Sequence, residues 1–175
     1  MLPLPDVAFA ALASGVLVAS VVDIRSRRIP NALTATMAAT GVGLAATGLS
    51  GISLGASLAG CALGLALMLP GHALGATGAG DVKLMAAVGA VVGPALVISA
   101  FLFTAIAGGV LALAVALRRR RLGATLAGTG RLIAAPGEAR QELRAATGSS
   151  RFAYGPAIAI GSMLAALTGS RVLGF

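Results

Sequence analysis

Long apolar runs alternate with short breaks of polar residues, glycine or proline along the chain. The runs occupy approximately residues 7–22, 32–49, 52–69, 82–92, 95–117 and 152–168. A backbone in lipid must satisfy its hydrogen bonds within its own segment, so apolar runs of about 17–25 residues indicate transmembrane helices. The pattern predicts an all-α, polytopic membrane protein with about six transmembrane helices. We expect residues 1–175 to form a single membrane-embedded domain.

Two of these runs are shorter than a bilayer requires. At about 1.5 Å per residue, run 82–92 reaches only about halfway across before Gly93 and Pro94. It either continues past Pro94 with a kink or forms a half-helix. The first run, 7–22, is slightly short, which leaves a signal peptide as an alternative. No basic segment precedes it, however, and this favours an uncleaved span.

Composition and charge narrow the classes of function. The chain is 58% hydrophobic and only 10% charged, far from an ordinary soluble domain. Its net charge of +8 does not indicate nucleic-acid binding, because there is no Trp, aromatic residues are few, and the arginines flank apolar runs. The single Cys61 excludes a disulfide framework and paired CxxC zinc motifs. No cluster of metal ligands is visible, and we expect neither a metal nor a cofactor.

The positions of Lys and Arg predict which side each loop occupies. Basic residues mark the cytoplasmic side, so Arg25, Arg27 and Arg28 place the first loop inside and the N-terminus outside. Counting spans onward places loops 70–80 and 118–151 inside as well. Every basic residue except Arg171 then lies on that side, which supports run 82–92 as a span.

The basic loop 118–151 is the only sizeable segment predicted outside the membrane. Pro136 and the glutamates Glu138 and Glu142, followed by Gly148, are typical of the start and end of a short helix. We expect an interfacial helix here. Its arginines are best explained as anchors to lipid headgroups, with a specific partner site as the alternative.

Two of the three aspartates are predicted at the cytoplasmic edge, in separate loops. These are Asp23 and Asp81, whereas Asp6 is expected on the opposite side. An aspartate at a membrane helix is costly and is a functional candidate. Non-catalytic explanations exist: Asp23 can pair with its neighbouring arginines, and Asp81 can complement a helix N-terminus.

Together, the two carboxylates suggest acid–base chemistry. Two close carboxylates share one proton, so one acts as a base and the other as an acid, as in aspartic peptidases. No Ser-His-Asp set can be assembled, since the only histidine, His72, is expected in a loop. The glycines Gly75, Gly78 and Gly80 before Asp81 allow either close backbone approach or positive φ, and such a loop suits docking of an extended peptide.

Three stretches resemble a known family: VVDIRSRRIPNALT (21–34), GAGDVKLMAAVG (78–89) and RFAYGPAIAIG (151–161). They are similar to type IV prepilin peptidases, in particular the short form of tight-adherence (Flp-type) pilus systems. The resemblance implies an aspartic peptidase with Asp23 and Asp81 as the catalytic pair. The other positions that match the family motifs are Gly78, Gly80, Lys83, Pro30, Asn31, Tyr154 and Gly155.

The resemblance also implies a location and a substrate. Such enzymes remove the leader from prepilins or pseudopilins at the cytoplasmic face of the inner membrane of a prokaryote. The lipid bilayer and possible contacts with pilus-assembly machinery are the other implied partners. Longer relatives also methylate the new N-terminus and carry an insert with paired CxxC motifs. This chain lacks that insert, so we expect cleavage without methylation.

The remaining motif positions have simpler explanations as well. Pro30 and Asn31 mark a helix start, with the proline in the first turn or the asparagine as the cap. Tyr154 is expected to anchor at the membrane interface. Lys83 either steadies the ionised pair, contacts substrate, or extends its ammonium group from the membrane edge into water.

Two other classes of function remain as alternatives. A small ion- or proton-coupled transporter would use the same aspartates as a relay, but would place acidic residues nearer the span centres. A non-catalytic pilus-assembly scaffold would recognise pilin stems without cutting them, and would be favoured by loss of either aspartate.

Overall fold

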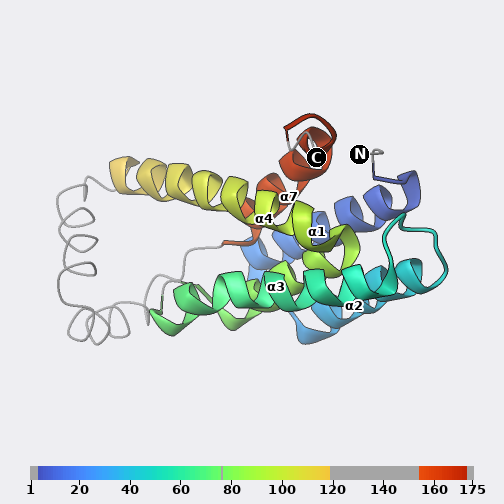
Figure 1. Cartoon of the computed structure of the whole chain (residues 1–175). Coiled ribbons are helices and arrows are strands. Elements are labelled where there is room, and N and C mark those ends of the chain that lie inside the picture. Colours follow the sequence, from blue (N-terminus) through green and yellow to red (C-terminus); the bar gives the residue numbers. More distant parts are fainter. Residues whose placement is uncertain (1–3, 76, 119–153, 173–175) are drawn as a thin grey trace.

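The computed structural model describes residues 4–75, 77–118 and 154–172, and all regular secondary structure in these ranges is helical (Figure 1). This confirms the predicted all-α class. The predicted interfacial helix, and all of loop 118–151 beyond Arg118, lie outside the described residues. The helices are α1 (Asp6–Ser26), α2 (Asn31–Ala46), α3 (Leu54–Ala73), α4 (Ala79–Arg118) and α7 (Gly155–Val172).

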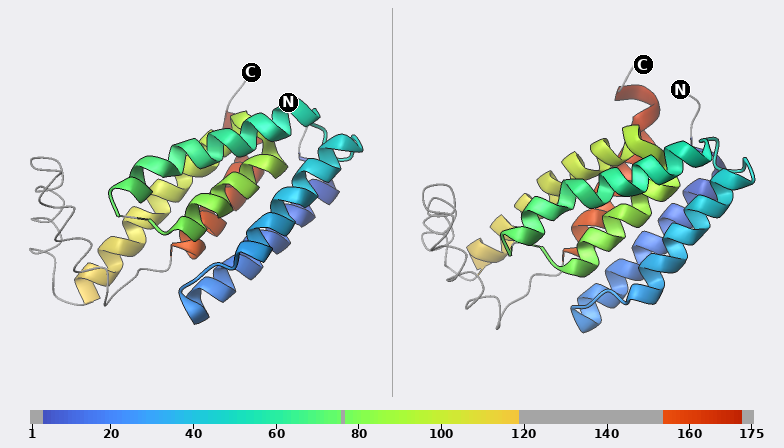
Figure 2. Two further views of the ribbon diagram at one scale, coloured as in Figure 1. Left: turned by 90° about the horizontal axis from the view of Figure 1, so that it is seen from below. Right: turned by 60° about the horizontal axis from the view of Figure 1, so that its bottom comes forward.

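Helix α4 is divided at Gly93, where the backbone leaves the helical region with φ 79° and ψ 177°. Glycine accommodates this positive φ, and Pro94 follows directly. Both views in Figure 2 show the chain turning back at this point, so the second half of α4 returns toward the end where the first half began. The predicted runs 82–92 and 95–117 are therefore the two halves of α4, and the chain does not continue through a mild kink.

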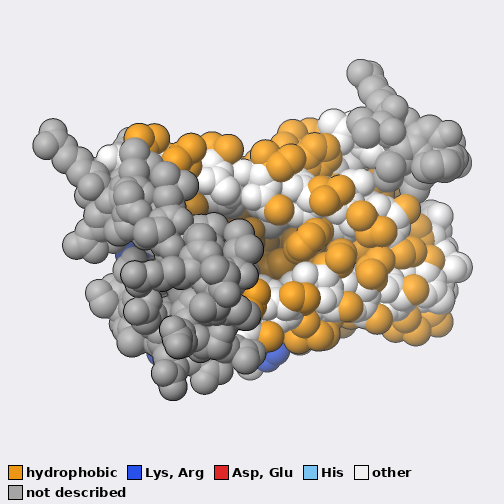
Figure 3. Space-filling model, turned by 60° about the vertical axis from the view of Figure 1, so that its left-hand side comes forward, with side chains coloured by type: hydrophobic (Ala, Val, Ile, Leu, Met, Phe, Trp, Pro, Cys, Tyr) orange, Lys and Arg blue, Asp and Glu red, His pale blue; other side chains and the backbone are white. Residues whose placement is uncertain are grey.

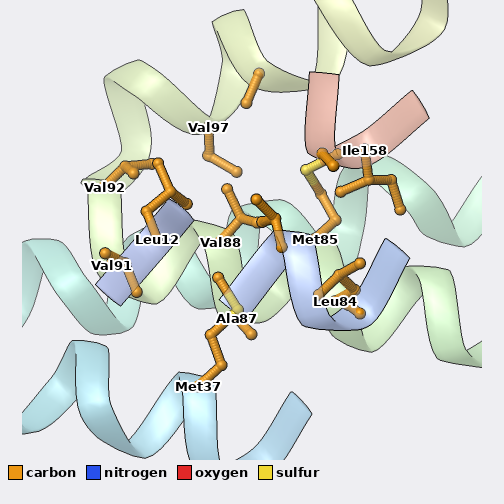
Figure 4. Close-up of a cluster of buried hydrophobic side chains, with 14 of the residues drawn as sticks. Leu12, Met37, Leu84, Met85, Ala87, Val88, Val91, Val92, Val97 and Ile158 are labelled. Carbon is orange, nitrogen blue, oxygen red and sulfur yellow. The ribbon is translucent and has the colours of Figure 1, made fainter. Parts of the chain in front are cut away.

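The first half of α4 forms the centre of the molecule. Every residue from 84 to 93 is buried, and Leu84, Met85 and Val88 are fully enclosed (Figure 4). Side chains of α1, α2 and α7 reach them: Leu12, Met37 and Ile158 belong to the same cluster. Because protein surrounds this short helix, bilayer thickness does not set its length.

Glycines on the neighbouring helices allow the close packing around this central helix. A Cβ on Gly60 of α3 would overlap the backbone of Gly89 and Gly93, and one on Gly41 of α2 would lie 2.7 Å from the carbonyl carbon of Ala90. The Ser57 hydroxyl also donates a buried 2.6 Å hydrogen bond to the Ala90 carbonyl. Small residues at helix contacts are typical of membrane proteins, where the close approach of backbones provides the attraction.

The outer surface is apolar along the length of the helices. Figure 3 shows hydrophobic side chains covering the flank of the bundle. Three of the described helices are long and apolar enough to cross a membrane, and Gly155–Gly169 is a shorter apolar helix. The chain is thus a polytopic membrane protein; the number of spans and their sidedness remain predictions. The three candidate spans are Asp6–Ser26, Leu54–Ala73 and Ala79–Ala114.

Several helix boundaries differ from the sequence prediction. Helix α1 continues four residues past the predicted end and closes only where Arg27 adopts a left-handed conformation. Helix α3 continues through Pro70 to Ala73, because a proline near a helix end removes one hydrogen bond without ending the helix. His72 therefore lies in the last turn of α3, and the prediction that it is a loop residue was wrong.

We expect Gly60→Val to destabilise the protein by about 1–3 kcal/mol or more, because the new side chain would overlap the backbone of α4. Thermal unfolding in detergent measures this effect. The matched control is Gly43→Ala in α2, where no atom lies within 4 Å of the added Cβ, so stability should be unchanged or slightly increased. Equal stability of the two variants would contradict the packing described for α3 and α4.

Candidate active site

The two candidate aspartates lie at helix ends rather than in loops, which corrects the sequence prediction. Asp23 is in the last turns of α1 and Asp81 is in the first turn of α4. Both are buried, with exposed fractions of 5% and 7%. Asp6, by contrast, is exposed at the start of α1, about 25 Å from Asp23 along the helix axis.

The carboxylate of Asp23 is held by the start of α7. The Gly155 backbone N–H donates a buried 2.8 Å hydrogen bond to Asp23 Oδ2. This bond joins residues far apart in the sequence and ties α1 to α7. Gly155 leaves no room for a side chain, since an added Cβ would lie 2.9 Å from both Cβ and Oδ2 of Asp23. Glycine at this position therefore allows the backbone itself to serve as the hydrogen-bond donor.

The carboxylate of Asp81 is held within the first turn of its own helix. The N–H of Gly78, which precedes α4, donates to Asp81 Oδ2 at 2.9 Å, while the Asp81 N–H bonds back to the Gly78 carbonyl at 3.1 Å. An acidic side chain reaching back to the residue before a helix is the second half of a capping box. Asp81 therefore caps the start of α4, and this hydrogen bond fixes one of its carboxylate oxygens.

The three glycines before Asp81 serve different purposes. Gly75 has a positive φ of 80°, which turns the chain out of α3. Gly80 instead permits close approach, since an added Cβ would lie 3.1 Å from Ile29 Cβ and 3.5 Å from the Ile29 nitrogen and oxygen. Gly78 provides the N–H that Asp81 accepts. Positive φ and close backbone approach, the two properties suggested from the sequence, thus occur at different glycines.

Tyr154 connects the surroundings of the two aspartates. It directly precedes α7, and its ring lies against Gly108 in the second half of α4. Burial raises the pKa of Tyr154 above its ordinary value, and the negative charge of Asp81 raises this pKa further. Asp81 thus lies within electrostatic reach of Tyr154, whose neighbour Gly155 binds Asp23. Asp23 therefore contacts this segment through the Gly155 hydrogen bond, and Asp81 acts on it through its charge. The tyrosine itself is partly buried against α4.

Lys83 of α4 contacts Asn31, which follows Pro30 at the start of α2. Pro30 precedes α2 in an extended conformation and Asn31 is the first helical residue, so the asparagine is not the cap. Its side-chain oxygen instead accepts a 2.8 Å hydrogen bond from Lys83 Nζ. The ammonium group of Lys83 is therefore bound to α2.

Two residues at this end of the molecule were not singled out from the sequence. Ile29 is buried beneath Gly80, and Gly108 provides the surface on which Tyr154 rests. In the sequence, these two residues stand out only as an isoleucine directly before Pro30 and as part of a Gly-Gly pair within an apolar run. His72 Nδ1 lies 3.0 Å from the Thr77 carbonyl. Among the residues that the structure describes, no three His, Cys, Asp or Glu side chains lie close enough together to bind a metal ion.

Comparison with known protein families identifies the chain. The model of the type IV leader peptidase family matches residues 10–113, more than half of the sequence and a range that includes both buried aspartates. The chain belongs to the type IV leader peptidase family. No match was found among curated proteins or among solved structures. The Tyr154–Gly155 segment lies outside the matched range.

Membership in the leader peptidase family sets the general activity. It makes the chain a peptidase of the type that removes leaders from prepilin-type substrates. The apolar helices agree with a membrane location for such an enzyme.

We expect Asp81→Asn to lower the pKa of Tyr154, because the substitution removes a negative charge that disfavours the phenolate. The chain has one Tyr and no Trp, so ultraviolet absorbance of the phenolate reports Tyr154 alone. A pH titration of purified protein in detergent measures the midpoint. Asp6→Asn, at the other end of α1, should leave it unchanged. An identical midpoint in wild type and Asp81→Asn would place Asp81 away from Tyr154.

Gly155→Ala should displace the Asp23 carboxylate, because the added methyl group occupies its position. We expect leader cleavage to fall on the order of tenfold to a hundredfold, as a small displacement of a reacting group has effects of this size. Gly109→Ala is the matched control, since no atom lies within 4 Å of its added Cβ. Comparable cleavage by both variants would show that Gly155 is not required to place Asp23.

Proposed function

We propose that this leader peptidase is an aspartic endopeptidase that uses Asp23 and Asp81 to cleave prepilins or pseudopilins at the cytoplasmic face of the inner membrane of a prokaryote. The observation that carries the proposal is the placement of these two buried carboxylates. They come from separate helices, α1 and α4; Gly155 donates a hydrogen bond to Asp23, and the negative charge of Asp81 acts on the adjacent Tyr154. Both also lie within the range that matches the family.

The chemistry follows from two carboxylates that share one proton. The ionised carboxylate takes a proton from a water molecule as its oxygen forms a bond to the scissile carbonyl carbon. The protonated carboxyl group gives its proton to the carbonyl oxygen. As the tetrahedral intermediate collapses, the C–N bond breaks and the leaving amine takes the proton that the first carboxylate removed from water. A hydroxyl of the intermediate returns a proton to the second carboxylate, which restores the starting state. The two glycine N–H groups each fix one carboxylate oxygen while these protons move.

The charge at this end of the bundle supports cleavage at the cytoplasmic face. Arg25, Arg27 and Arg28 lie at the same end of α1 as Asp23, and basic residues concentrate on the cytoplasmic side of membrane proteins. A substrate leader approaching from the cytoplasm would meet the segments around Pro30, Gly78 and Tyr154 first. We propose that these segments receive the substrate.

We further propose that the enzyme cleaves without methylating the new N-terminus and corresponds to the short form of the tight-adherence systems. A single cysteine leaves no paired CxxC motifs, which accompany the methyltransferase insert of longer relatives. The chain would then be one membrane-embedded domain with a basic cytoplasmic loop at 118–151.

Co-expression with an Flp-type prepilin tests the proposal. Wild type should remove the leader, and mass spectrometry should find an unmethylated N-terminus. Asp23→Asn and Asp81→Asn should each abolish cleavage while still accumulating in membranes. Asp6→Asn is the matched control and should cleave normally, because this exposed residue lies at the opposite end of α1.

Each contrary result has a distinct meaning. Normal cleavage by either the Asp23 or the Asp81 variant would overturn the assignment of the catalytic pair. A methylated product would contradict the predicted lack of methyltransferase activity. Retention of the leader by membrane-inserted wild type would favour a scaffold or a transporter.

A further inference from the structure

The contact between Lys83 and Asn31 joins two parts of the chain that carry the aspartates. Lys83 lies two residues after Asp81 in α4, and its Nζ donates a 2.8 Å hydrogen bond to the side chain of Asn31 at the start of α2. The bond is exposed, and exposed contacts of this kind contribute little to global stability. The main effect of this hydrogen bond is therefore on the position of neighbouring groups.

A second contact joins the same two segments. Gly80 lies against Ile29, which is only 8% exposed. Positions 80 and 83 are three residues apart and therefore lie on one face of α4. That face holds the segment 29–31 at two points, one buried and apolar, the other exposed and polar.

The segment 29–31 is in turn attached to the end of α1 that bears Asp23. The Arg27 N–H bonds to the Asp23 carbonyl at 2.8 Å. The Ser26 hydroxyl lies 2.8 Å from the Val22 carbonyl and 2.9 Å from the Arg28 carbonyl, so it links the last turn of α1 to the connection that follows. A continuous series of contacts therefore runs from the backbone of Asp23, through residues 26–31, to the helix that carries Asp81.

We propose that Lys83 and Asn31 are a positioning pair that sets the separation between the carboxylates of Asp23 and Asp81. The inference rests on the proposed function, since the separation matters because the two groups share a proton. Neither residue of the pair need touch the substrate. Without their hydrogen bond, the segment loses its polar attachment to α4, and the distance between the two aspartates becomes less fixed.

The pH dependence of cleavage reports this separation. Two carboxylates at close range repel when both are ionised, which opposes loss of the second proton from the pair. Greater separation weakens this repulsion. The alkaline limb of the bell-shaped pH profile of leader cleavage should then move to lower pH, which narrows the profile. A loss of folded protein would lower the whole profile without changing its width.

Kinetics of the full-length enzyme in membranes test the pair directly. Lys83→Met and Asn31→Leu should each lower kcat on the order of tenfold, with KM unchanged and a narrower pH profile. The kcat of the double variant should equal that of the more impaired single variant, because each substitution removes the same hydrogen bond. Lys83→Arg keeps a donor and should recover part of kcat. Thr40→Val is the matched control, because it removes an exposed hydrogen bond that lies within α2 itself.

A distance measurement tests the pair independently of activity. Spin labels are placed at Ile24 of α1 and Ala79 of α4, two exposed positions next to the aspartates, after Cys61→Ser removes the native thiol. Pulsed electron paramagnetic resonance should give a broader distribution of distances between the two labels in Lys83→Met and in Asn31→Leu than in wild type or Thr40→Val.

The two measurements separate the possible failures. An unchanged distance distribution in both variants overturns the positioning role. So does a raised KM in Lys83→Met with normal kinetics in Asn31→Leu, because that result makes Lys83 a substrate contact. If wild type fails to cleave any prepilin, the proposed function fails, while the label distances still decide whether the pair positions the two aspartates.

Discussion

A carboxylate buried among apolar helices requires hydrogen-bond donors, and this requirement shapes one whole end of the molecule. The free donors in a helical protein are the backbone N–H groups at helix starts. Asp81 uses the N–H that precedes α4, and Asp23 uses the first N–H of α7. The end of α1 and the start of α7 must therefore meet, and glycine stands at each donor because a side chain would crowd the carboxylate.

The sequence predicts the helices well, because the apolar runs report directly on burial in lipid or protein. It predicts boundaries less well at the ends of α1 and α3. The predicted runs end at residues 22 and 69, whereas the helices continue to Ser26 and Ala73, because a cation is favourable in a last helical turn and a late proline is tolerated. Run 82–92 is too short to cross on length alone, and only its neighbours, brought close by glycines, explain how it is buried.

The candidate site could be identified from the sequence but not assembled from it. Asp23 and Asp81 were distinctive because acidic residues are rare in this chain, and their motifs indicated the family. Their partners were not predictable, since a backbone N–H has no signature of its own and Gly155 is 132 residues from Asp23. The contact between Asn31 and Lys83 could not be predicted from the sequence either, because it depends on how α2 packs against α4.

The turn at Gly93 has a consequence for how the protein enters the membrane. The first half of α4 leaves the ribosome before the second half, yet at about 20 Å it is too short to cross a bilayer of about 30 Å. It therefore cannot be inserted as an independent segment. We expect it to enter together with the longer second half, as one arm of a hairpin, beside the earlier helices α1 to α3. The most enclosed helix of the finished protein depends on the segment made after it.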